Sequence, residues 1–263
     1  AIRAVLAKAG ATIIHAADPC VLPKARKNKT EQQGARAAQT RDGVAMSRFL
    51  CWLEHTAPEG RLDEIAVARR LEQFRKDTGV LMDLSFGTIS AAGPNAAIPH
   101  YHVSPENSRP LAMNEIFLID SGGQYQDGTT DITRTTVIGQ PTDEMRDRFT
   151  RVLKGMVGLS RIRFPKGTCG SQLDVLARGH LWMAGLDFDH GTGHGVGLEI
   201  HEAPTLGYSA TGTLADRMSV TVEPGIYLPE RGGVRIEDTL VVRDTGGPEL
   251  LTTTTKDLLV LDA

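Results

Sequence analysis

The amino-acid sequence predicts an α+β domain, and two observations carry this prediction. Apolar residues recur at helical spacing in two pairs of segments, residues 30–57 with 63–79 and residues 142–162 with 171–184. Short apolar runs bounded by Gly, Pro, Asn and Asp follow each pair, and such runs are typical of β-strands. The order of helix, helix and strands therefore occurs twice, which predicts two similar halves packed about one sheet, with a site between them.

The N-terminal segment is predicted to be separate from this domain. Residues 1–17 carry apolar and basic side chains at helical spacing, and residues 18–29 have the Pro and Lys/Arg content of a connector. Because the chain has no initiator Met and opens inside a helix, we expect a longer N-terminal region in the full-length protein. We accordingly assign residues 1–27 as a remnant or linker of that region, and residues 28–263 as the main domain.

Local signals indicate where the individual elements begin and end. Thr30 before Glu31 fits a capping box that opens the first long helix, which ends before Pro58. The second helix opens at Asp63 and ends near Gly79. Strands are predicted at residues 85–89, 115–120, 131–138, 219–222, 225–228, 234–242 and 258–261.

Composition and charge exclude several classes of protein. Lys and Arg number 29 against 32 Asp and Glu, for a net charge of -3, so nothing favours nucleic acid or an anionic membrane as a partner. No apolar run approaches the ~20 residues of a membrane span, and the N-terminus lacks the apolar core of a signal peptide. Cys20, Cys51 and Cys169 are scattered and form no CxxC pair, which fits a reducing compartment. We expect a soluble, cytoplasmic protein.

Two aspartates are candidates for a metal site. Asp120 and Asp131 each adjoin an apolar, strand-like run, and segments 121–123 and 127–128 between them have the composition of a hairpin turn. A hairpin would bring both carboxylates to one place, where a bound dication would hold both ionised. An Asx turn and a surface Asp explain this pair alone equally well.

A stretch rich in Gly and His, residues 190–197, is harder to explain by structure alone. Its glycines cost backbone entropy and make sense where the backbone approaches a ligand or metal closely. Val196 occupies the third glycine position of GxGxxG, so a dinucleotide site is only weakly indicated. His190, His194 and His201 supply three imidazoles close together, which favours a ligand or catalytic role over single structural histidines.

Two glutamates lie beside apolar strands near the C-terminus. Glu223 follows the run 219–222, and Glu237 lies in an alternating stretch that puts Arg235 and Glu237 on one face of a strand and apolar residues on the other. A carboxylate that points from a strand toward the core is costly unless it is paired or bound to metal. If Glu237 is considered by itself, an exposed ion pair with Arg235 is the simpler explanation of its presence.

Together, Asp120, Asp131, His194, Glu223 and Glu237 supply four carboxylates and one imidazole. Hard oxygen donors with one nitrogen suit Mn²⁺, Mg²⁺, Co²⁺ or Fe²⁺ better than a structural zinc. Two dications sharing carboxylates would balance the charge, and a water bridging metals ~3.5–4 Å apart becomes a nucleophile near neutral pH. This predicts hydrolysis of an amide without a Ser or Cys nucleophile, and no GxSxG, Walker or HExxH motif competes.

These residues resemble the metallopeptidases of the pita-bread fold, which include methionine aminopeptidases, prolidases and Xaa-Pro aminopeptidases. The resemblance implies that Asp120 chelates one metal, that Asp131 and Glu237 bridge both, and that His194 and Glu223 complete the second. It also implies a pseudo-two-fold arrangement of helices on a curved, mostly antiparallel sheet. The cofactor would be two divalent cations, with Mn²⁺ the first choice and Co²⁺, Zn²⁺, Fe²⁺ or Mg²⁺ as alternatives.

Three segments, residues 93–101, 127–135 and 190–194, resemble the Xaa-Pro aminopeptidase branch most. This implies hydrolysis of the N-terminal residue from peptides with proline at the second position. Full-length members of this branch carry N-terminal domains that help form the oligomer and the substrate pocket. We therefore expect a peptide as substrate, a homodimer in the full-length protein, and no nucleic-acid or membrane partner.

The same resemblance implies roles for further residues. His100 would contact substrate and shuttle protons, His201 would contact the scissile carbonyl, and Glu223 would also take a proton from the bridging water. His102 is the rival to His100, and the family's His-Tyr pair favours His100. Alongside His100 and His201, two further residues are expected to bind substrate: His190 and Arg235.

Two alternatives remain open. From Leu198 onwards the sequence is more similar to the shorter, prolidase-related subgroup, so an Xaa-Pro dipeptidase is the nearest alternative. Methionine aminopeptidases fit less well, because segments 93–95 and 128–131 differ from theirs. An alternative of another class is a catalytically inactive pita-bread domain that binds peptide or protein, which would not require the five ligands.

Overall fold

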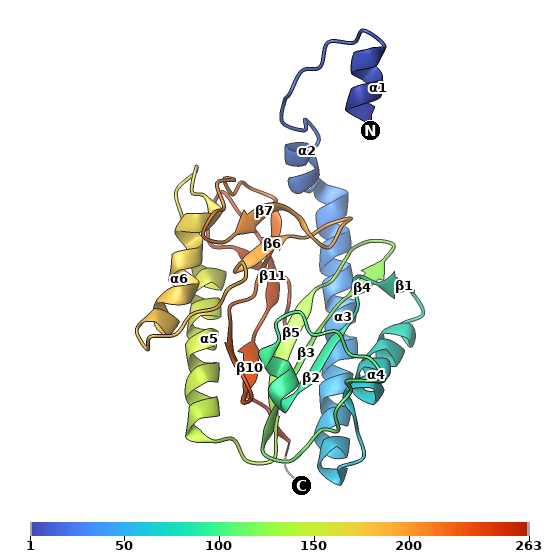
Figure 1. Cartoon of the computed structure of the whole chain (residues 1–263), viewed down its shortest axis with the longest axis vertical. Coiled ribbons are helices and arrows are strands. Elements are labelled where there is room, and N and C mark those ends of the chain that lie inside the picture. Colours follow the sequence, from blue (N-terminus) through green and yellow to red (C-terminus); the bar gives the residue numbers. More distant parts are fainter. Residues whose placement is uncertain (1, 262–263) are drawn as a thin grey trace.

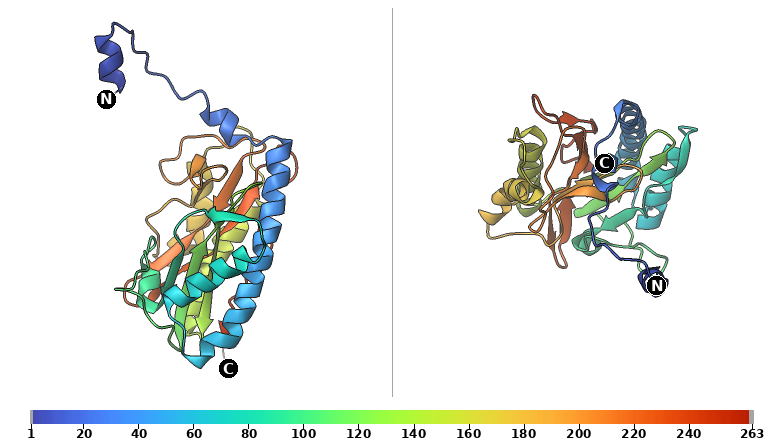
Figure 2. Two further views of the ribbon diagram at one scale, coloured as in Figure 1. Left: turned by 90° about the vertical axis from the view of Figure 1, so that its right-hand side faces the viewer. Right: turned by 90° about the horizontal axis from the view of Figure 1, so that it is seen from above.

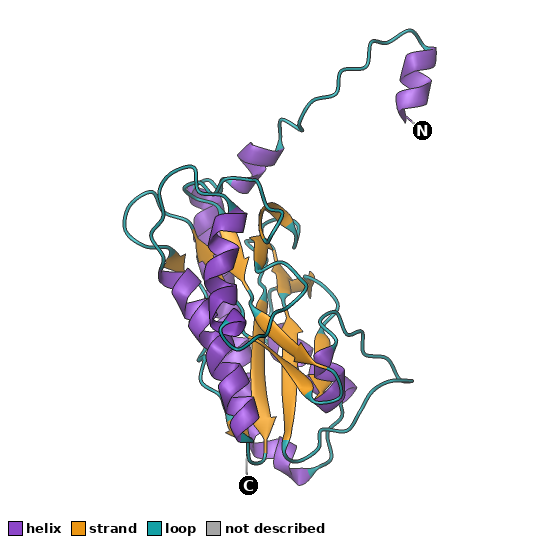
Figure 3. Cartoon of the chain, turned by 60° about the vertical axis from the view of Figure 1, so that its left-hand side comes forward, coloured by secondary structure: helices purple, strands orange, loops and turns teal. Residues whose placement is uncertain are grey.

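Helices and strands form separate layers in the computed structural model, which describes residues 2–261. Two pairs of helices form the outer layers: α3 (Lys29–Thr56) with α4 (Glu64–Lys76), and α5 (Asp143–Arg161) with α6 (Gly170–Trp182). Figure 1 shows these pairs on opposite sides of the strands, and Figure 3 shows helices and strands by colour. Among residues 2–261, no helix has the length and apolar character needed to cross a membrane. The α+β class and the repeated order of elements are confirmed.

The first half is built on a four-stranded sheet with the order β13, β5, β3, β2. Its strands are β2 (Ile89–Ala92), β3 (Glu115–Ser121), β5 (Ile132–Ile138) and β13 (Val260–Leu261). β3 pairs antiparallel with β2 and β5, and β13 pairs parallel with β5. Phe49 and Leu53 of α3 share one buried cluster with Phe117 and Ile119 of β3. Burial of such side chains stabilises the fold by roughly 1.5–3 kcal/mol each, which attaches α3 to the sheet.

The second half is built on a five-stranded sheet with the order β12, β11, β8, β6, β7. Its strands are β6 (Gly193–Gly195), β7 (Glu202–Leu206), β8 (Ser219–Val222), β11 (Asp238–Val241) and β12 (Glu249–Leu250). Met156 of α5 and Leu181 of α6 belong to a second buried cluster, together with Val220 and Leu240 of the sheet. Each half therefore has its own helix pair, while this second cluster also takes in Ile116 and Leu118 of the first sheet.

The two halves meet at β5. Its neighbour there is the segment around Glu237, which follows a short hairpin of the second half. β9 (Gly225–Leu228) and β10 (Gly232–Arg235) form this hairpin, and a separate antiparallel pair joins β1 (Leu81–Leu84) to β4 (Gly123–Tyr125), which is distant in the chain. Between β10 and β11, Glu237 forms an antiparallel bridge with Thr133 of β5, and its N–H donates to the Thr133 carbonyl at 3.2 Å. This contact brings strand ends from both halves to one point.

The first part of the N-terminal segment lies outside the two halves of the fold. Helix α1 (Ile2–Lys8) has no buried residue, and Figures 1 and 2 show it on an extended connection away from the rest of the chain. A short helix, α2 (Val21–Ala25), lies inside the predicted connector. Beyond it, the Lys27 N–H donates to the Arg217 carbonyl, and the Lys27 ammonium pairs with Glu202 at 2.7 Å. The chain just before the predicted boundary at residue 28 thus contacts the second half directly.

The cap of α3 differs from the sequence prediction. Asn28, not Thr30, is the N-cap: the Glu31 N–H donates to the Asn28 side chain at 3.0 Å, and the Asn28 N–H donates to the Glu31 carboxylate at 2.7 Å. Both residues have suitable side chains, but only Asn28 stands three positions before an acidic residue.

Two predicted strands differ in the structure, because the strands that flank each break pair with different partners. The predicted strand 85–89 is wrong except at residue 89, and the predicted strand 234–242 is divided. Residues 85–88 form a bend between β1, which pairs with β4, and β2, which pairs with β3. The predicted strand 234–242 is interrupted at Ile236 and Glu237, since β10 pairs with β9 and β11 pairs with β8. The short strands β6 and β7 were not predicted at all.

Candidate metal and catalytic site

A cavity of about 800 Å³ contains nearly every residue singled out in the sequence. Its lining includes all five predicted metal ligands and three further histidines: Asp120, Asp131, His194, Glu223, Glu237, His100, His190 and His201. The remaining candidate, Arg235, is buried beside this lining. The structure therefore brings these residues together from both halves of the chain.

The hairpin of β3 and β5 positions the two aspartates. Asp120 is the second-last residue of β3 and pairs with Thr133, and Asp131 immediately precedes β5. In the connection, backbone hydrogen bonds of 2.9 Å join Tyr125 to Gly128 and Thr130 to Gly123. The hairpin that the turn residues predicted is confirmed.

His194 lies in β6, and a hydrogen bond to the backbone helps to orient its ring. Because a carbonyl can only accept, Nδ1 donates to the Gly195 carbonyl at 3.0 Å. Nε2 then faces Asp131 Oδ2 at 3.5 Å and Glu223 Oε1 at 3.4 Å. A neutral imidazole in this tautomer presents a free Nε2 lone pair, which is the form that binds a metal.

The glycines on either side of His194 have a structural explanation. A Cβ on Gly193 would lie 2.0 Å from the carbonyl oxygen of Thr221, and one on Gly195 would lie 2.2 Å from that of Ala203. The interpretation that glycines here make room for a ligand or metal is therefore wrong for these two positions. They allow β6 to lie close to the backbones of β8 and β7.

The two glutamates are held by different contacts, one to the backbone of the second half and one to a side chain of the first. Glu223 follows β8, and its N–H donates to the Thr192 carbonyl at 2.8 Å. Glu237 Oε2 accepts a hydrogen bond of 2.8 Å from the Thr133 hydroxyl, across the junction of the halves. The predicted alternation is correct here, since Glu237 lines the cavity while its neighbour Ile236 lies in the core.

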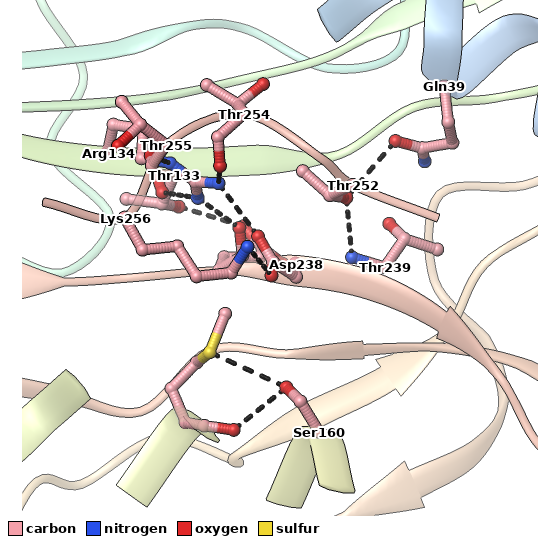
Figure 4. A network of polar contacts seen from close by, with 12 residues as sticks. Gln39, Thr133, Arg134, Ser160, Asp238, Thr239, Thr252, Thr254, Thr255 and Lys256 are labelled. Carbon is pink, nitrogen blue, oxygen red and sulfur yellow. Dashed lines mark hydrogen bonds and ion pairs between the residues drawn. The ribbon is translucent and has the colours of Figure 1, made fainter. Parts of the chain in front are cut away.

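A buried arginine, Arg134, holds the backbone at the start of β11, and Figure 4 shows it beside Asp238, Thr254 and Thr255. Arg134 donates to the Glu237 carbonyl at 2.7 Å, to the Asp238 carboxylate at 2.9 Å and to the Thr255 carbonyl at 2.7 Å. Lys256 pairs with the other oxygen of Asp238 at 2.8 Å. The start of β11 is thereby tied to β5 and to the C-terminal segment, which limits the movement of Glu237.

The carboxylates raise one another's pKa. Burial and the neighbouring charge of Asp120 raise the pKa of Asp131 well above its ordinary value, and burial with the charge of Asp131 does the same to Glu237. Burial also raises the pKa of Glu223 to about 8, although Arg235 opposes the shift. Burial lowers the pKa of His194 to about 4. With no cation bound, protons are thus favoured on carboxylates and disfavoured on the imidazole.

This arrangement fits divalent cations. One ligand atom from each of Asp131, His194 and Glu237 lies within 4.8 Å of the others. In the described part of the chain, four buried carboxylate oxygens have no hydrogen-bond partner. One belongs to Asp238 and pairs with Lys256 as an ion pair, and the other three lie one each on Asp120, Asp131 and Glu237. Unpaired carboxylate oxygens beside a neutral imidazole are the donor set that a hard or borderline dication requires.

A chain of hydrogen bonds connects Asp120 to His190. Arg235 donates to Asp120 at 2.7 Å and to the Tyr227 hydroxyl at 2.6 Å. His190 Nδ1 donates to the Gly191 carbonyl at 2.7 Å, so its Nε2 accepts from the Tyr227 hydroxyl, also at 2.7 Å. Both ring nitrogens of His190 are therefore occupied within the protein. Arg235 pairs with Asp120, and the exposed pair with Glu237 considered from the sequence does not form.

The comparisons with known proteins can be set against this geometry. The model of metallopeptidase family M24 matches residues 33–244. The chain belongs to this family. It is 47% identical over 229 residues to a probable Xaa-Pro aminopeptidase P of Tuber melanosporum, covering 84% of this chain and 37% of that protein. It is 44% identical over 226 residues to Xaa-Pro aminopeptidase 2 of Sus scrofa, covering 85% of this chain and 34% of that protein. The chain thus spans about a third of the length of these curated relatives.

Solved structures of similar proteins share the fold of this M24 chain. The X-prolyl aminopeptidase of Caenorhabditis elegans, described as a cytosolic enzyme with a di-nuclear active site, matches with a TM-score of 0.84 and 42% identity, over 89% of this chain and 41% of that one. The Xaa-Pro dipeptidase of Bacillus anthracis matches with a TM-score of 0.83 and 32% identity, over 92% of this chain and 65% of that one. The predicted pita-bread fold is confirmed.

Sequence reasoning missed the residues that support this M24 site. Tyr227 shares a face of β9 with Gly225, so strand periodicity after Glu223 could have identified it. Glu64 had no such signal, because an acidic residue in the first turn of a helix is common. Its buried carboxylate accepts from the Tyr101 hydroxyl at 2.9 Å and from the Asn95 amide at 3.0 Å. Glu64 thereby anchors the segment that carries His100.

Proposed function

We propose that this M24 domain is the catalytic part of a dinuclear metal-dependent aminopeptidase, which removes the N-terminal residue from peptides with proline at the second position. One observation carries the proposal: four carboxylates and the free Nε2 of His194 converge in a cavity that also contains His100 and His201. The names of the similar proteins, Xaa-Pro aminopeptidases in the main, support the choice of substrate.

The proposed cofactor is a pair of divalent cations, with Mn²⁺ as the first choice. Five residues would hold it: Asp120, Asp131, His194, Glu223 and Glu237. When bound, such a pair lowers the pKa of water and polarises the carbonyl of the scissile amide. The ionised ligand set carries a charge of about −4, which two dications balance.

The chain's own side chains would bind the peptide and move protons. The Glu223 carboxylate faces the cavity from the end of β8 and would accept the proton that the attacking water loses. The His201 ring lies 4.3 Å from the His194 ring and would contact the scissile carbonyl. In the described part of the chain, the ring nitrogens of His100 and His201 make no hydrogen bond to protein, so both are available to substrate. His190 would contact the peptide through its ring, because its nitrogens are engaged.

Metal content and peptide hydrolysis, measured on the same purified sample supplied with Mn²⁺, test this proposal. We expect about two equivalents of metal and release of the first residue of an Xaa-Pro-Xaa tripeptide. Asp131→Asn removes an ionisable ligand and should lower both metal content and hydrolysis, the latter by about 100-fold or more. The variant should remain folded, since it also removes a repulsive buried charge.

The same assay separates the alternatives. Hydrolysis of Xaa-Pro dipeptides but not of tripeptides would replace this proposal by prolidase activity, which the Bacillus anthracis dipeptidase makes a specific alternative. A folded sample that binds no metal and hydrolyses neither peptide would exclude a dinuclear enzyme. It would favour a peptide- or protein-binding module.

The organisation of the full protein is also a proposal. We assign residues 28–263 to the catalytic domain and residues 1–27 to a linker, and we expect a homodimer, which light scattering of the full-length protein would test. The cytoplasmic location remains a prediction, based on the scattered cysteines, all of which are free: Cys20, Cys51 and Cys169.

A further inference from the structure

Arg178 of α6 is a buried cation that the proposed chemistry does not use. Its side chain is 1% exposed. Nε donates to the Asp174 carboxylate at 2.7 Å, Nη1 to the Asp187 carboxylate at 2.8 Å and to the Phe188 carbonyl at 2.5 Å, and Nη2 to the His190 carbonyl at 2.8 Å. Every nitrogen of the guanidinium thus contacts α6 or the segment that leads into the cavity.

The same guanidinium lies between two aromatic rings. It is 3.9 Å from the centroid of Phe188 and 4.0 Å from that of Tyr208. Phe188 lies 4.9 Å from the His190 ring, and Tyr208 stacks on Trp182 at 6.4 Å with an interplanar angle of 6°. Stacking of this kind is a strength of Arg that Lys does not share.

Arg178 therefore joins two walls of the cavity. One wall contains His190 and Gly191, and the other contains the neighbours of Tyr208, namely Gly207 and Ser209. A change in the position of the guanidinium would move both walls, because it contacts both segments directly.

The partner of Arg178 extends this contact to Glu223. Asp174 accepts from Arg178 through one oxygen and from the Thr192 hydroxyl, at 2.5 Å, through the other. The Thr192 carbonyl in turn accepts from the Glu223 N–H at 2.8 Å. Arg178, Asp174 and Thr192 are all buried, so water does not compete for these hydrogen bonds.

We propose that Arg178 is a positioning residue that determines how tightly the cavity holds a peptide, by setting the place of His190 and the separation of the two walls. The proposal rests on the proposed peptidase function. Metal binding should depend little on Arg178, because His194 and Glu237 are anchored by their own contacts to Gly195 and Thr133, and Glu223 meets the Arg178 network only through its backbone N–H.

Arg178→Lys tests the proposal, because it keeps the charge but has one nitrogen in place of a planar fork. We expect KM for an Xaa-Pro-Xaa tripeptide to rise by about 10-fold, as is typical when a group that orients a site residue is lost, with kcat changed far less and metal content unchanged. Arg75→Lys is the matched control: Arg75 is 0% exposed, pairs with Asp42 through two hydrogen bonds of 2.8 and 3.0 Å, and does not line the cavity. It should lower Tm without changing KM.

A second pair of variants serves if Arg178→Lys does not fold. Tyr208 is 57% exposed, so its substitution carries little risk to folding. Tyr208→Leu removes the ring that covers the guanidinium and should raise KM, whereas Tyr208→Phe keeps the ring and should restore KM to nearly the wild-type value. Equal KM values for wild type, Arg178→Lys and Tyr208→Leu would overturn the proposal.

A measurement without turnover separates this inference from the proposed function. In metal-free protein, the imidazole ¹H–¹⁵N signal of His190, assigned with His190→Gln, reports its hydrogen bonds to Gly191 and Tyr227. Arg178→Lys should shift this signal and Arg75→Lys should not, even if wild-type protein hydrolyses no peptide. An unchanged His190 signal in folded Arg178→Lys would refute the positioning role, whatever the enzyme assay shows.

Discussion

Burial raises the cost of ionising Asp131, Glu223 and Glu237, and the neighbouring charge of Asp120 adds to it for all three. The pKa of each is raised, chiefly by burial, and Arg235 is a cation that opposes the rise for Asp131 and Glu223. In the proposed site, protons and metal ions would therefore compete for the same oxygen atoms. Because the ligands must be deprotonated to bind, metal affinity should increase with pH.

The two neighbouring histidines His100 and His102 allow a matched test of one residue's role. His100 lines the cavity, whereas His102 is exposed, does not line it, and contributes only its carbonyl to a hydrogen bond with Asn107. His100→Gln should lower kcat/KM for the tripeptide by about 100-fold, the range of a lost proton-transferring group. His102→Gln should change it by less than about twofold, as expected of a surface substitution. The reverse order of effects in steady-state assays would assign the role to His102.

Helix α3 positions the turn that leads into Asp131. A Cβ on Gly34 would lie 2.0 Å from the Asp127 carbonyl oxygen, so only glycine allows the turn to lie this close to the helix. Farther along α3, Arg41 pairs with both oxygens of Asp127 at 3.0 Å. The helix thus holds the turn by a close backbone approach and by an ion pair, and Asp131 follows four residues later.

Gly34→Ala should disturb the site through this element. The added methyl group must displace helix or turn, which should lower the free energy of unfolding by about 1–3 kcal/mol and reduce metal binding. Gly158→Ala is the control, because Gly158 is exposed on α5 with no atom within 4 Å of an added Cβ. That change should stabilise the protein by roughly 0.5–1 kcal/mol and leave metal content unchanged. Urea unfolding and metal analysis of both variants provide the check, and equal effects would exclude the close contact.

At the scale of the whole molecule, the site lies at the junction of the two halves, so its charge affects the stability of the assembled fold. Asp120 and Asp131 come from the first half, and His194, Glu223 and Glu237 from the second. Mutual repulsion across the junction opposes folding when no cation is bound. Bound dications would reverse this effect and stabilise the folded state by mass action.

The metal-free protein should lose stability between about pH 6.5 and pH 8, where carboxyl groups are ionised in the unfolded chain while Glu223 still holds its proton in the folded one. Folding raises the pKa of Glu223 from 4.5 to about 8, so its contribution is complete below the unfolded-state pKa and is lost as the pH rises through about 8. The buried histidines have lowered pKa values, about 4 for His190 and His194, and their contribution is lost on acidification instead. The window from about pH 6.5 to pH 8 therefore isolates the carboxylates.

Urea unfolding of chelator-treated protein at about pH 6.5 and about pH 8 measures this loss of stability. The free energy of unfolding should fall by on the order of 1 kcal/mol per pH unit. Glu223→Gln, which cannot ionise, should reduce the slope, and excess Mn²⁺ should abolish or reverse it. A metal-free protein that is equally stable or more stable at the higher pH would contradict the assignment of raised pKa values.

The residues of the candidate site were predicted more fully than the residues that hold them in place. The five ligands, His190 and His201 stood out because carboxylates beside apolar runs and a cluster of histidines are costly without a purpose, and this cost can be judged from local sequence. His100 was expected only from the family resemblance. Tyr227, Glu64 and Arg178 were missed, since each acts through a contact with a segment far away in the chain.

The sequence by itself determined the two helix pairs, the Asp120–Asp131 hairpin and the candidate ligands, because helical spacing, turn residues and strand-end carboxylates are patterns within short segments. Only the tertiary structure decided that Glu237 pairs with Thr133, that Arg235 neutralises Asp120, and that the glycines beside His194 serve strand packing. These outcomes depend on which distant segments lie side by side, and that is set by burial of two apolar cores rather than by any local pattern.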